Sequence, residues 1–462
     1  MQTSINLTKQ ETNKLEEQTE TGLTGQSEIS LTEQSKISST EQTVTKLWNK
    51  NFVMLAIGQV ISLFGNAILR FALPMYILLE YGSPELMGRV MGLAVVPMIF
   101  ISPLGGVLAD RVNKKRLIVF LDFFTAIAAF LYLWAFGILS IIPITIIMLM
   151  LLFSINSMMS AATDSSYPLI VPTDQLVRAN SVGMTVNTLA MMLGPAIGGI
   201  LIVSVGLIAL LFVGGICFAL AAIMELFIRI PDVKQDSSGN IVKIIAGDIM
   251  DGIRFAVKEQ PILAKILLVI VMVQFAVASF GHVGIPVLVT QSLGLEASMA
   301  GIAMAFIGAG GIVGGIVSGI LGQRVRIQKN HWRLFAMSIG LIPMGLAFFL
   351  SVNVTVTFVI IAATMFVAMC VATMFTVQII TFFQRVTPPE LLGKMMALVM
   401  SATVLAQPFG QWAYGILFER FLHDPWIVIF IAAFSGTIVA LWSRKHFKSI
   451  RRLPSESRVE FN

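Results

Sequence analysis

The chain has 462 residues, of which 56% are apolar and only 12% are charged, whereas soluble domains carry roughly 25% charged residues. This composition excludes a soluble globular enzyme. The formal net charge of +6 would suit a nucleic-acid-binding protein, but the positions of the basic residues along the chain give a different explanation.

The first segment, residues 1 to about 46, is rich in Thr, Glu, Gln and Ser and has no aromatic residue. Such a segment cannot bury enough apolar surface to fold alone. It also lacks the basic start and apolar core of a signal peptide. We expect a disordered cytoplasmic tail.

Twelve apolar stretches follow, each long enough to cross about 30 Å of hydrocarbon as a helix. They run over about 52–79, 88–109, 116–136, 140–163, 180–204, 207–228, 262–290, 298–322, 332–351, 355–384, 391–417 and 425–446. The sequence therefore predicts an all-α polytopic membrane protein with 12 transmembrane helices, located in the lipid bilayer of a cell membrane.

The basic residues fall on one side of the predicted membrane. Of the 31 Lys and Arg residues, all but Arg70, Arg89 and Arg420 lie in the tails or next to loops on the side of the termini. Because cytoplasmic loops carry an excess of Lys and Arg, both termini are predicted to be cytoplasmic. Topology thus accounts for the positive charge, and no nucleic-acid partner is expected.

An internal repeat divides the chain into two parts. Residues 105–112 (GGVLADRV) match residues 318–325 (SGILGQRV), and Pro195 matches Pro408. Parallel repeats of six spans are typical of transporters that rock around a site near the midplane. The predicted organisation is a tail at 1–46, a six-helix bundle at 47–229, a linker with an amphipathic helix at 230–261, a second six-helix bundle at 262–447 and a basic tail at 448–462.

The loop after the second span reads GGVLADRVNKK over residues 105–115, which resembles the signature loop G-x-L-a-D-R-x-G-R-K of the major facilitator superfamily. Asn113, which tolerates a left-handed backbone, replaces the second Gly. The resemblance covers residues 47–447 and implies two six-helix bundles that alternate access. It also implies a conformational latch, although such a cluster can equally be a plain topology signal. The implied latch residues are Gly106, Asp110, Arg111, Lys114, Lys115 and Asp164.

Residues 190–199 (AMMLGPAIGG) resemble the antiporter motif G-x-x-x-G-P-x-x-G-G, with Ala190 in place of the first Gly. The matching positions are Gly194, Pro195, Gly198 and Gly199, and plain helix packing would explain them as well. The first span and the stretch VPTDQLVRANSV are similar to the drug:proton antiporter branch that contains macrolide-efflux and enterobactin-exporter proteins. This resemblance favours export, but lysophospholipid transporters are related and the substrate stays open.

Polar side chains within the spans are costly unless they are hydrated or paired, so they are candidates for a substrate cavity. Spacings of three and four residues place the polar residues of the first span on one helical face. Arg70 either contacts substrate or reaches the membrane interface as an anchor, and His282 occupies the corresponding position in the second repeat. The cavity candidates are Gln59, Ser62, Asn66, Arg70, Asn156, Asn187, Gln274, His282, Gln378, Gln407 and Gln411.

Proton coupling needs a group that titrates as its surroundings change. Asp122, Glu225 and His282 are the candidates, for coupling or for gating, and an interfacial ion-pair network is the alternative interpretation of the two acids. The four histidines form no hydrolase or metalloprotease motif and no nucleotide-binding loop is present. We therefore expect no enzyme, no metal and no cofactor besides the proton gradient.

These patterns together predict a monomeric secondary transporter that exports amphipathic, macrolide-like or drug-like molecules by proton-coupled alternating access. A lysophospholipid or siderophore carrier of the same fold is one alternative. A membrane sensor that does not transport is the other.

Overall fold

The computed structural model describes residues 47–231, 247, 250–321 and 327–450, and it describes only the backbone of 102–111 and of 390. In this part of the chain, 12 helical regions are long and apolar enough to cross a membrane. The fold class and the number of spans predicted from the sequence are therefore confirmed.

The first six spans and their connections, here called the N-half, consist of continuous helices. Asn49 caps the first one by accepting a hydrogen bond from the Phe52 N–H at 2.9 Å. Gly82 ends it with a φ of 62°, a conformation that favours glycine. The elements are α2 (Lys50–Tyr81), α3 (Pro84–Arg111), α4 (Lys114–Ala135), α5 (Ile141–Asp164), α6 (Tyr167–Ile170), η1 (Thr173–Gln175), α7 (Leu176–Ser204) and α8 (Gly206–Glu225).

The last six spans, here called the C-half, include three that are interrupted. The seventh contains π-helical turns, the ninth breaks between α13 and α14, and the eleventh breaks at Ala406. The elements are η2 (Phe255–Glu259), α10 (Pro261–Val273), η3 (Gln274–Ala278), α11 (Ser279–Val287), η4 (Leu288–Ser292), α12 (Ala297–Leu321), η5 (Ile327–Lys329), α13 (Asn330–Ile339), α14 (Ile342–Phe349), α15 (Val354–Val386), α16 (Pro389–Leu405), α17 (Gln407–Arg420) and α18 (Pro425–Ser449).

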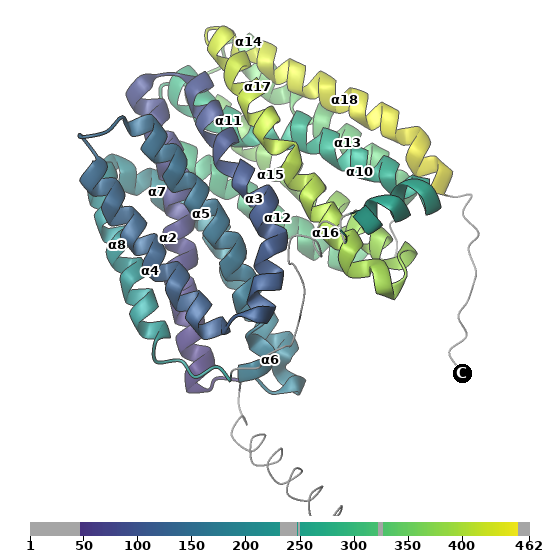
Figure 1. The fold of residues 1–462 in the computed structure, drawn as a ribbon. Coiled ribbons are helices and arrows are strands. Elements are labelled where there is room, and N and C mark those ends of the chain that lie inside the picture. The colour runs from purple at the N-terminus through teal and green to yellow at the C-terminus, as the bar shows by residue number, and fades with distance from the viewer. Residues whose placement is uncertain (1–46, 232–246, 248–249, 322–326, 451–462) are drawn as a thin grey trace, which may run out of the picture.

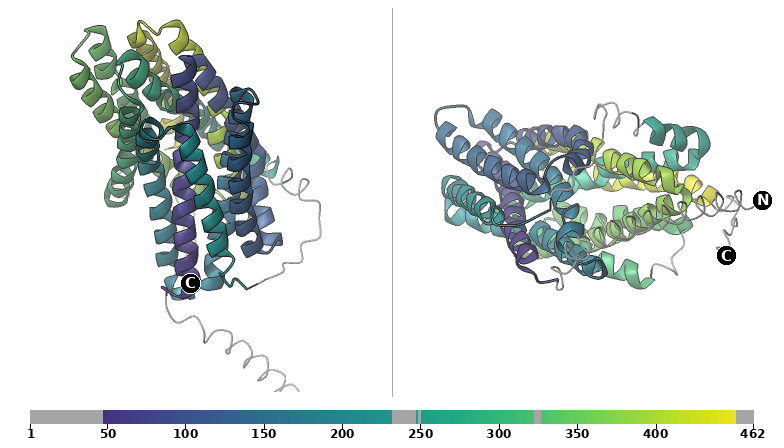
Figure 2. Two further views of the ribbon diagram at one scale, coloured as in Figure 1. Left: turned by 90° about the vertical axis from the view of Figure 1, so that its left-hand side faces the viewer. Right: turned by 60° about the horizontal axis from the view of Figure 1, so that its bottom comes forward.

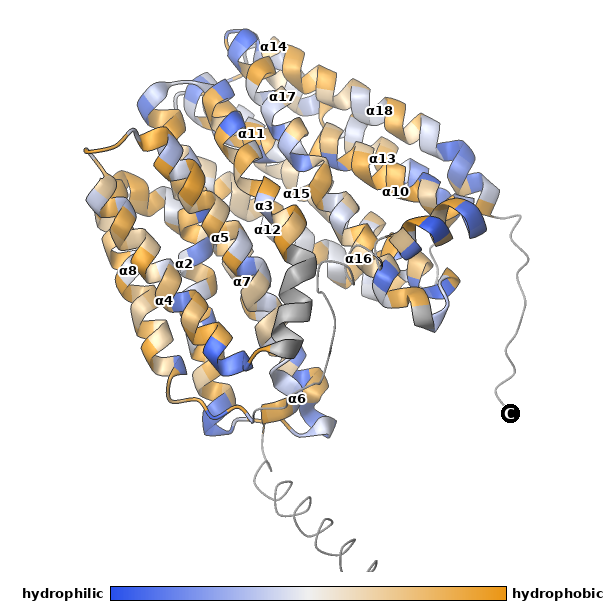
Figure 3. Cartoon of the chain, in the orientation of Figure 1, coloured by the Kyte–Doolittle hydropathy of each residue, from blue (hydrophilic) through white to orange (hydrophobic). Residues whose placement is uncertain are grey.

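The two halves converge at one end of the molecule and diverge at the other (Figure 1). We call the end where α2 begins and α18 ends the terminal end, and the opposite end the hairpin end. The second view of Figure 2 shows the halves side by side, with the N-half in purple and blue and the C-half in green and yellow. The hydropathy colouring in Figure 3 shows mostly apolar residues along the middle of the helices and polar residues gathered toward their ends.

Close helix contacts join the halves toward the hairpin end. A Cβ added at Gly88 of α3 would lie 2.5 Å from the carbonyl oxygen of Gln411 in α17. A Cβ added at Gly199 of α7 would lie 2.5 Å from the carbonyl oxygen of Ala297 in α12. The Ser83 hydroxyl also donates to Glu419 Oε2 at 2.8 Å. Small residues thus let the backbones meet and close this end of the molecule.

The described end of the linker packs on the C-half. Asp251 forms an ion pair of 2.6 Å with Lys394 of α16, and the Phe255 side chain is buried in the C-half core. Most of the predicted amphipathic helix lies outside the described residues. The predicted division of the chain into tails, bundles and linker stays a prediction.

Candidate transport site

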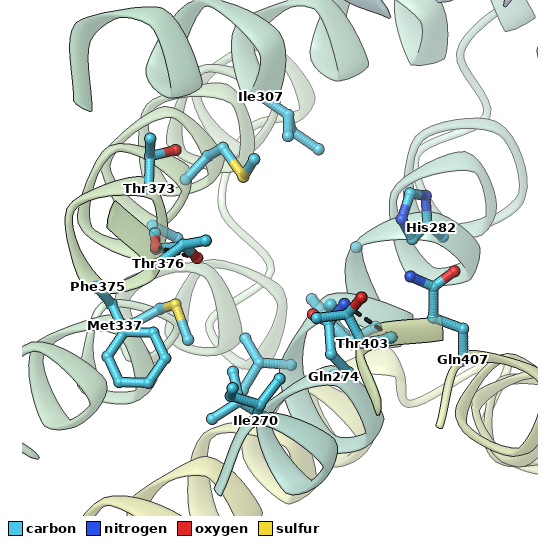
Figure 4. Close-up of a pocket in the computed structure, with 18 of the residues that line it drawn as sticks. Ile270, Gln274, His282, Ile307, Met337, Thr373, Phe375, Thr376, Thr403 and Gln407 are labelled. Carbon is cyan, nitrogen blue, oxygen red and sulfur yellow. Dashed lines mark hydrogen bonds between the residues drawn. The ribbon is translucent and has the colours of Figure 1, made fainter. Parts of the chain in front are cut away.

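A cavity of about 530 Å³ lies within the C-half, between the seventh span and the helices α12, α13, α15 and α16. Figure 4 shows residues from these elements around it. Most of its wall is apolar, and its methionines are Met304, Met337, Met365, Met369 and Met400. Its polar side chains are Gln274, His282, Thr373, Thr376, Thr403 and Gln407. Flexible thioethers around a large apolar space can adapt to bulky ligands of several shapes.

The interrupted helices shape this cavity. At the break in the eleventh span, Gln274 Nε2 donates to the carbonyl oxygen of Thr403 at 3.1 Å (Figure 4). Pro408 has no backbone N–H to donate to the carbonyl oxygen one turn earlier, so the helical hydrogen bonds are interrupted there. In the π-helical turn opposite, Tyr414 donates to the Ala276 carbonyl oxygen and Ser279 donates to that of Gln274. Irregular backbone at membrane depth is tolerated where such partners exist or where it lines a cavity.

Arg70 and His282 lie on opposite sides of the boundary between the halves, on α2 and α11. The His282 side chain is exposed although it lies within a span, because it faces the cavity. Arg70 of α2 is partly exposed, and its guanidinium lies 3.9 Å from the centre of the Phe153 ring in α5. The Arg70 guanidinium lies within electrostatic range of the His282 imidazole. The arrangement of this pair around one central site stays a prediction.

The rest of the polar face of α2 does not line this cavity. Ser62 donates to Asp122 Oδ1 at 2.7 Å, and Asn66 Nδ2 donates to the Leu152 carbonyl oxygen at 3.1 Å. Gln59 accepts from the Tyr167 hydroxyl at 3.0 Å. These polar side chains are buried inside the N-half, so the prediction that they face a water-filled cavity is corrected. Helical periodicity placed them on one face, but it could not show that α4, α5 and α6 cover that face.

Tyr167, in the turn after the fourth span, serves as a permanent donor. Burial and the nearby Asp164 raise the pKa of Tyr167 to about 12, although its hydrogen bond to Gln59 opposes the shift. Since an unperturbed tyrosine has a pKa of about 10, this hydroxyl keeps its proton at all physiological pH values. It therefore fixes Gln59 rather than leaving that amide free for a ligand.

Some of the other cavity candidates line the cavity in the C-half, and the rest lie elsewhere. Gln274, His282 and Gln407 line the cavity in the C-half. Gln378 instead accepts a hydrogen bond of 2.6 Å from Arg333 Nη1, and Gln411 is buried with an exposed fraction of only 2%. Two further candidates are partly exposed in the N-half and are not part of the wall of this cavity; they are Asn156 and Asn187.

The sequence did not single out the residues that form most of the cavity wall. Met365, Met369 and Thr373 recur every four residues along α15, and all three line the cavity. This repeat of side chains along one helix face was the sequence signal that could have identified the cavity wall. It is ambiguous, because the same spacing occurs on any buried helix face.

Asp122 and Glu225 meet inside the N-half. They lie on α4 and α8, both are almost fully buried, and their carboxyl groups interact with each other. A Cβ added at Gly58 of α2 would lie 2.8 Å from Glu225 Oε1, so the absence of a side chain there makes room for the acid. Apart from the Ser62 hydroxyl, neither carboxyl has a hydrogen-bond or ion-pair partner of another kind among the described residues. Among the described residues, Asp122 and Glu225 therefore take part in no ion-pair network, which was the alternative interpretation of these two acids.

Two carboxyl groups held together in a dry site cannot both ionise at low cost, because their like charges repel and burial disfavours each charge. The arrangement can therefore hold a proton between Asp122 and Glu225. The sequence named both acids but could not pair them, since they lie on helices far apart in the chain.

The predicted latch is only partly described. The side chains of Gly106, Asp110 and Arg111 lie outside the described residues. Lys114 and Lys115 form the first turn of α4, and Asp164 accepts a hydrogen bond of 3.3 Å from Ser160. The latch stays a prediction.

The antiporter-like motif lies where α2, α7 and α12 meet. A Cβ at Gly194 would lie 2.5 Å from the Ala67 Cβ of α2, and one at Gly198 would lie 3.0 Å from the Ile68 carbonyl oxygen. The Pro195 carbonyl oxygen contacts Gly301 of α12. The motif therefore packs α7 against both its own half and the C-half. The packing interpretation therefore agrees with these contacts, and a role of the motif in export stays a prediction.

Known proteins resemble this chain over both halves. A family model described as Major Facilitator Superfamily matches residues 55–411. Macrolide efflux protein A of Streptococcus pyogenes is 24% identical over 408 residues, covering 85% of this chain and 94% of that protein. The uncharacterized MFS-type transporter YkuC of Bacillus subtilis (strain 168) is 22% identical and covers 81% of this chain and 87% of that protein. The crystal structure of nucleoside transporter NupG matches with a TM-score of 0.67 at 15% identity, covering 86% of this chain and 100% of that one.

Proposed function

The chain belongs to the major facilitator superfamily, and from that premise we propose that it exports amphipathic small molecules by proton-coupled alternating access. Drug-like compounds, macrolides among them, are the first candidates, because relatives carrying the name macrolide efflux protein align over most of both chains. The observation that carries the proposal is the arrangement of the two halves, which converge at the hairpin end and diverge at the terminal end, beside an apolar cavity in the C-half.

The halves touch toward the hairpin end and diverge toward the terminal end (Figure 1). Lys and Arg gather at the terminal end, which favours a cytoplasmic location for it. With that orientation the described state faces the cytoplasm and can load substrate from it. Opening the contacts of α7 with α12 and of α3 with α17 would release the substrate outside the cell.

The cavity supports a substrate with a large apolar part. Its volume of about 530 Å³ falls within the range of drug-sized ligand sites, and its wall is mainly Met, Phe and aliphatic side chains. The amide and hydroxyl groups at its edge can orient polar atoms of the substrate.

The buried pair of Asp122 and Glu225 supports proton coupling. The pair contacts α2, which also carries Arg70 at the boundary between the halves. A proton that enters or leaves the pair changes the charge against one face of α2. We propose that this change biases the rocking equilibrium, since a group can drive motion only if its free energy differs between the two states.

The decisive experiment measures efflux of a panel of macrolides, dyes and lysolipids from cells, with and without an uncoupler that collapses the proton gradient. We expect extrusion of amphipathic drugs or dyes that stops when the uncoupler is added. Cells of the same strain that lack the protein are the control. Extrusion that ignores the uncoupler would contradict proton coupling, and absence of extrusion for every compound would contradict the export function.

Orientation and assembly belong to the same proposal. We propose a monomer in the bacterial cell membrane with both termini in the cytoplasm. Labelling of a single cysteine placed near Lys50 by a membrane-impermeant reagent should occur only after the membrane is opened, whereas a cysteine near Gly82 should react in intact cells. The reverse labelling pattern would contradict this orientation.

A further inference from the structure

Arg70 carries a charge at membrane depth that no group among the described residues neutralises. Among the described residues it forms no ion pair and donates no hydrogen bond, and its contacts of note are the Phe153 ring and the electrostatic effect on His282. The aromatic ring faces one side of the guanidinium and leaves its N–H edges free, since those edges point outward in the plane of the group. A guanidinium with free N–H groups can bind an anion through charge-assisted hydrogen bonds.

Snorkelling to the membrane surface does not explain the position of this side chain. Arg70 lies 11 residues from the last residue of α2, about 16 Å from the hairpin end at 1.5 Å per residue. Its guanidinium stacks on Phe153, which lies midway along the 24 residues of α5. The side chain therefore points toward the middle of the membrane rather than toward the nearer surface.

The neighbouring cavity also lacks a negative group. No Asp or Glu lines it, and between residues 261 and 389 the sequence contains one acid, Glu296, at the hairpin end of α12. His282 adds a further N–H donor at the edge of the cavity. The surroundings thus offer an apolar chamber next to one cation and one imidazole, with nothing to pair a substrate cation.

We propose that the substrate is an amphipathic anion, whose negatively charged group binds at Arg70 and His282 while its apolar part fills the cavity in the C-half. The inference rests on the proposed function and names the substrate class of that site. Within the drug-like compounds of the proposed function, it places amphipathic acids, sulfates and phosphates ahead of basic drugs, amine-bearing macrolides included, because their amines would meet the guanidinium charge.

Binding of three amphiphiles with the same decyl chain tests the inference. The probes are decyl sulfate, decyl dimethylphosphine oxide and decyltrimethylammonium, titrated calorimetrically into the full chain in phosphatidylcholine nanodiscs, with empty nanodiscs subtracted. We expect the sulfate to bind at least about tenfold more tightly than the neutral probe, equivalent to about 1.4 kcal/mol. The trimethylammonium probe should bind most weakly.

Variants assign the preference to its source. Arg70→Ala should remove the advantage of the sulfate and leave the neutral probe within about twofold, Arg70→Lys should keep most of it, and His282→Gln should reduce it by about two- to threefold. Arg89→Ala is the matched control, because it removes the same charge from an exposed ion pair with Glu85 at the hairpin end. Adding anionic phospholipid to the nanodiscs distinguishes a lipid from a free solute as the source of the anion, since a lipid that enters the site should compete with decyl sulfate.

Three results would overturn the inference. They are equal or reversed binding of the three probes by the unmodified protein, an unchanged preference in Arg70→Ala, and no binding of any probe. The order measured on the unmodified protein decides the matter even if Arg70→Ala fails to fold. The binding order requires neither a gradient nor transport, so a protein that shows it but extrudes nothing would contradict the proposed function alone. Uncoupler-sensitive export with no preference for the anion would contradict this inference alone.

Discussion

The two halves share a fold but solve different physical problems. The N-half has continuous helices that bury charged and polar groups, including the pair of Asp122 and Glu225. The C-half has three interrupted spans and a large apolar cavity with no Asp or Glu in its wall. Unbroken helices satisfy their own backbone and can hold a fixed acid pair, whereas broken helices free space and polar backbone groups for a ligand.

This difference suggests a division of labour in which the N-half holds the coupling proton and the C-half holds the apolar part of the substrate. Only the contacts between the halves would then link the two events. The following changes are ordered from the largest expected effect to the smallest, and each one addresses a single side of this division or the boundary.

Replacing both acids, by Asp122→Asn with Glu225→Gln, should reduce the uncoupler-sensitive part of efflux by about tenfold or more, because the amides cannot exchange a proton with the site. Ligand binding in the C-half should stay within about twofold in the same protein. Efflux assays and calorimetry on purified protein measure the two quantities. Asp251→Asn, which changes an exposed acid on the linker, is the control. Loss of binding together with efflux would show that the halves do not divide the task.

Replacing Gly301 by a larger residue should disturb the contact between the two halves. Gly301→Val places a side chain against the Pro195 carbonyl oxygen of the other half, and overpacking of this kind costs about 1–3 kcal/mol. We expect a lower thermal unfolding midpoint and slower transport. Gly315→Ala in the same helix is the matched control, because a Cβ there meets no atom within 4 Å. Equal behaviour of the two variants would show that the contact does not matter.

Filling the cavity should affect only the C-half. Ala368 lines the cavity, so Ala368→Trp is expected to weaken substrate binding by about tenfold, or about 1.4 kcal/mol, and to leave the proton-dependent behaviour of any residual efflux intact. Ala363→Trp is the matched control, because Ala363 lies on the exposed face of the same helix, away from the cavity. Binding measurements on both variants test this expectation, which unchanged affinity in Ala368→Trp would refute.

The smallest effect is expected from Gln274→Ala. It removes the hydrogen bond to the Thr403 carbonyl oxygen at the break in the eleventh span, at a cost of about 1 kcal/mol, since water in the cavity can replace the amide. A drop of a few degrees in the thermal midpoint would agree with this. Gln407→Ala, which alters a cavity residue without a hydrogen bond to another described residue, should leave the midpoint unchanged. A larger drop for Gln407→Ala would contradict the importance of the Gln274 bond.

The sequence was most informative where the signal was local. Apolar stretches separated by polar loops predicted all twelve spans within a few residues, because a helix must satisfy its own backbone in hydrocarbon. The matching prolines and the repeated loop predicted that His282 occupies in the second half the position of Arg70 in the first, and the two side chains lie on different halves within electrostatic range of each other.

Contacts between distant spans were decided by the tertiary structure. Periodicity placed Gln59, Ser62, Asn66 and Arg70 on one face of α2, but the packing of α4, α5 and α6 buried the first three and left Arg70 at the boundary. The pairing of Asp122 with Glu225 and the breaks at Gln274 and Ala406 likewise depend on which helices are neighbours. A period of 3.6 residues defines a face of a helix, and the choice among neighbour, lipid and cavity for that face is made by long-range packing.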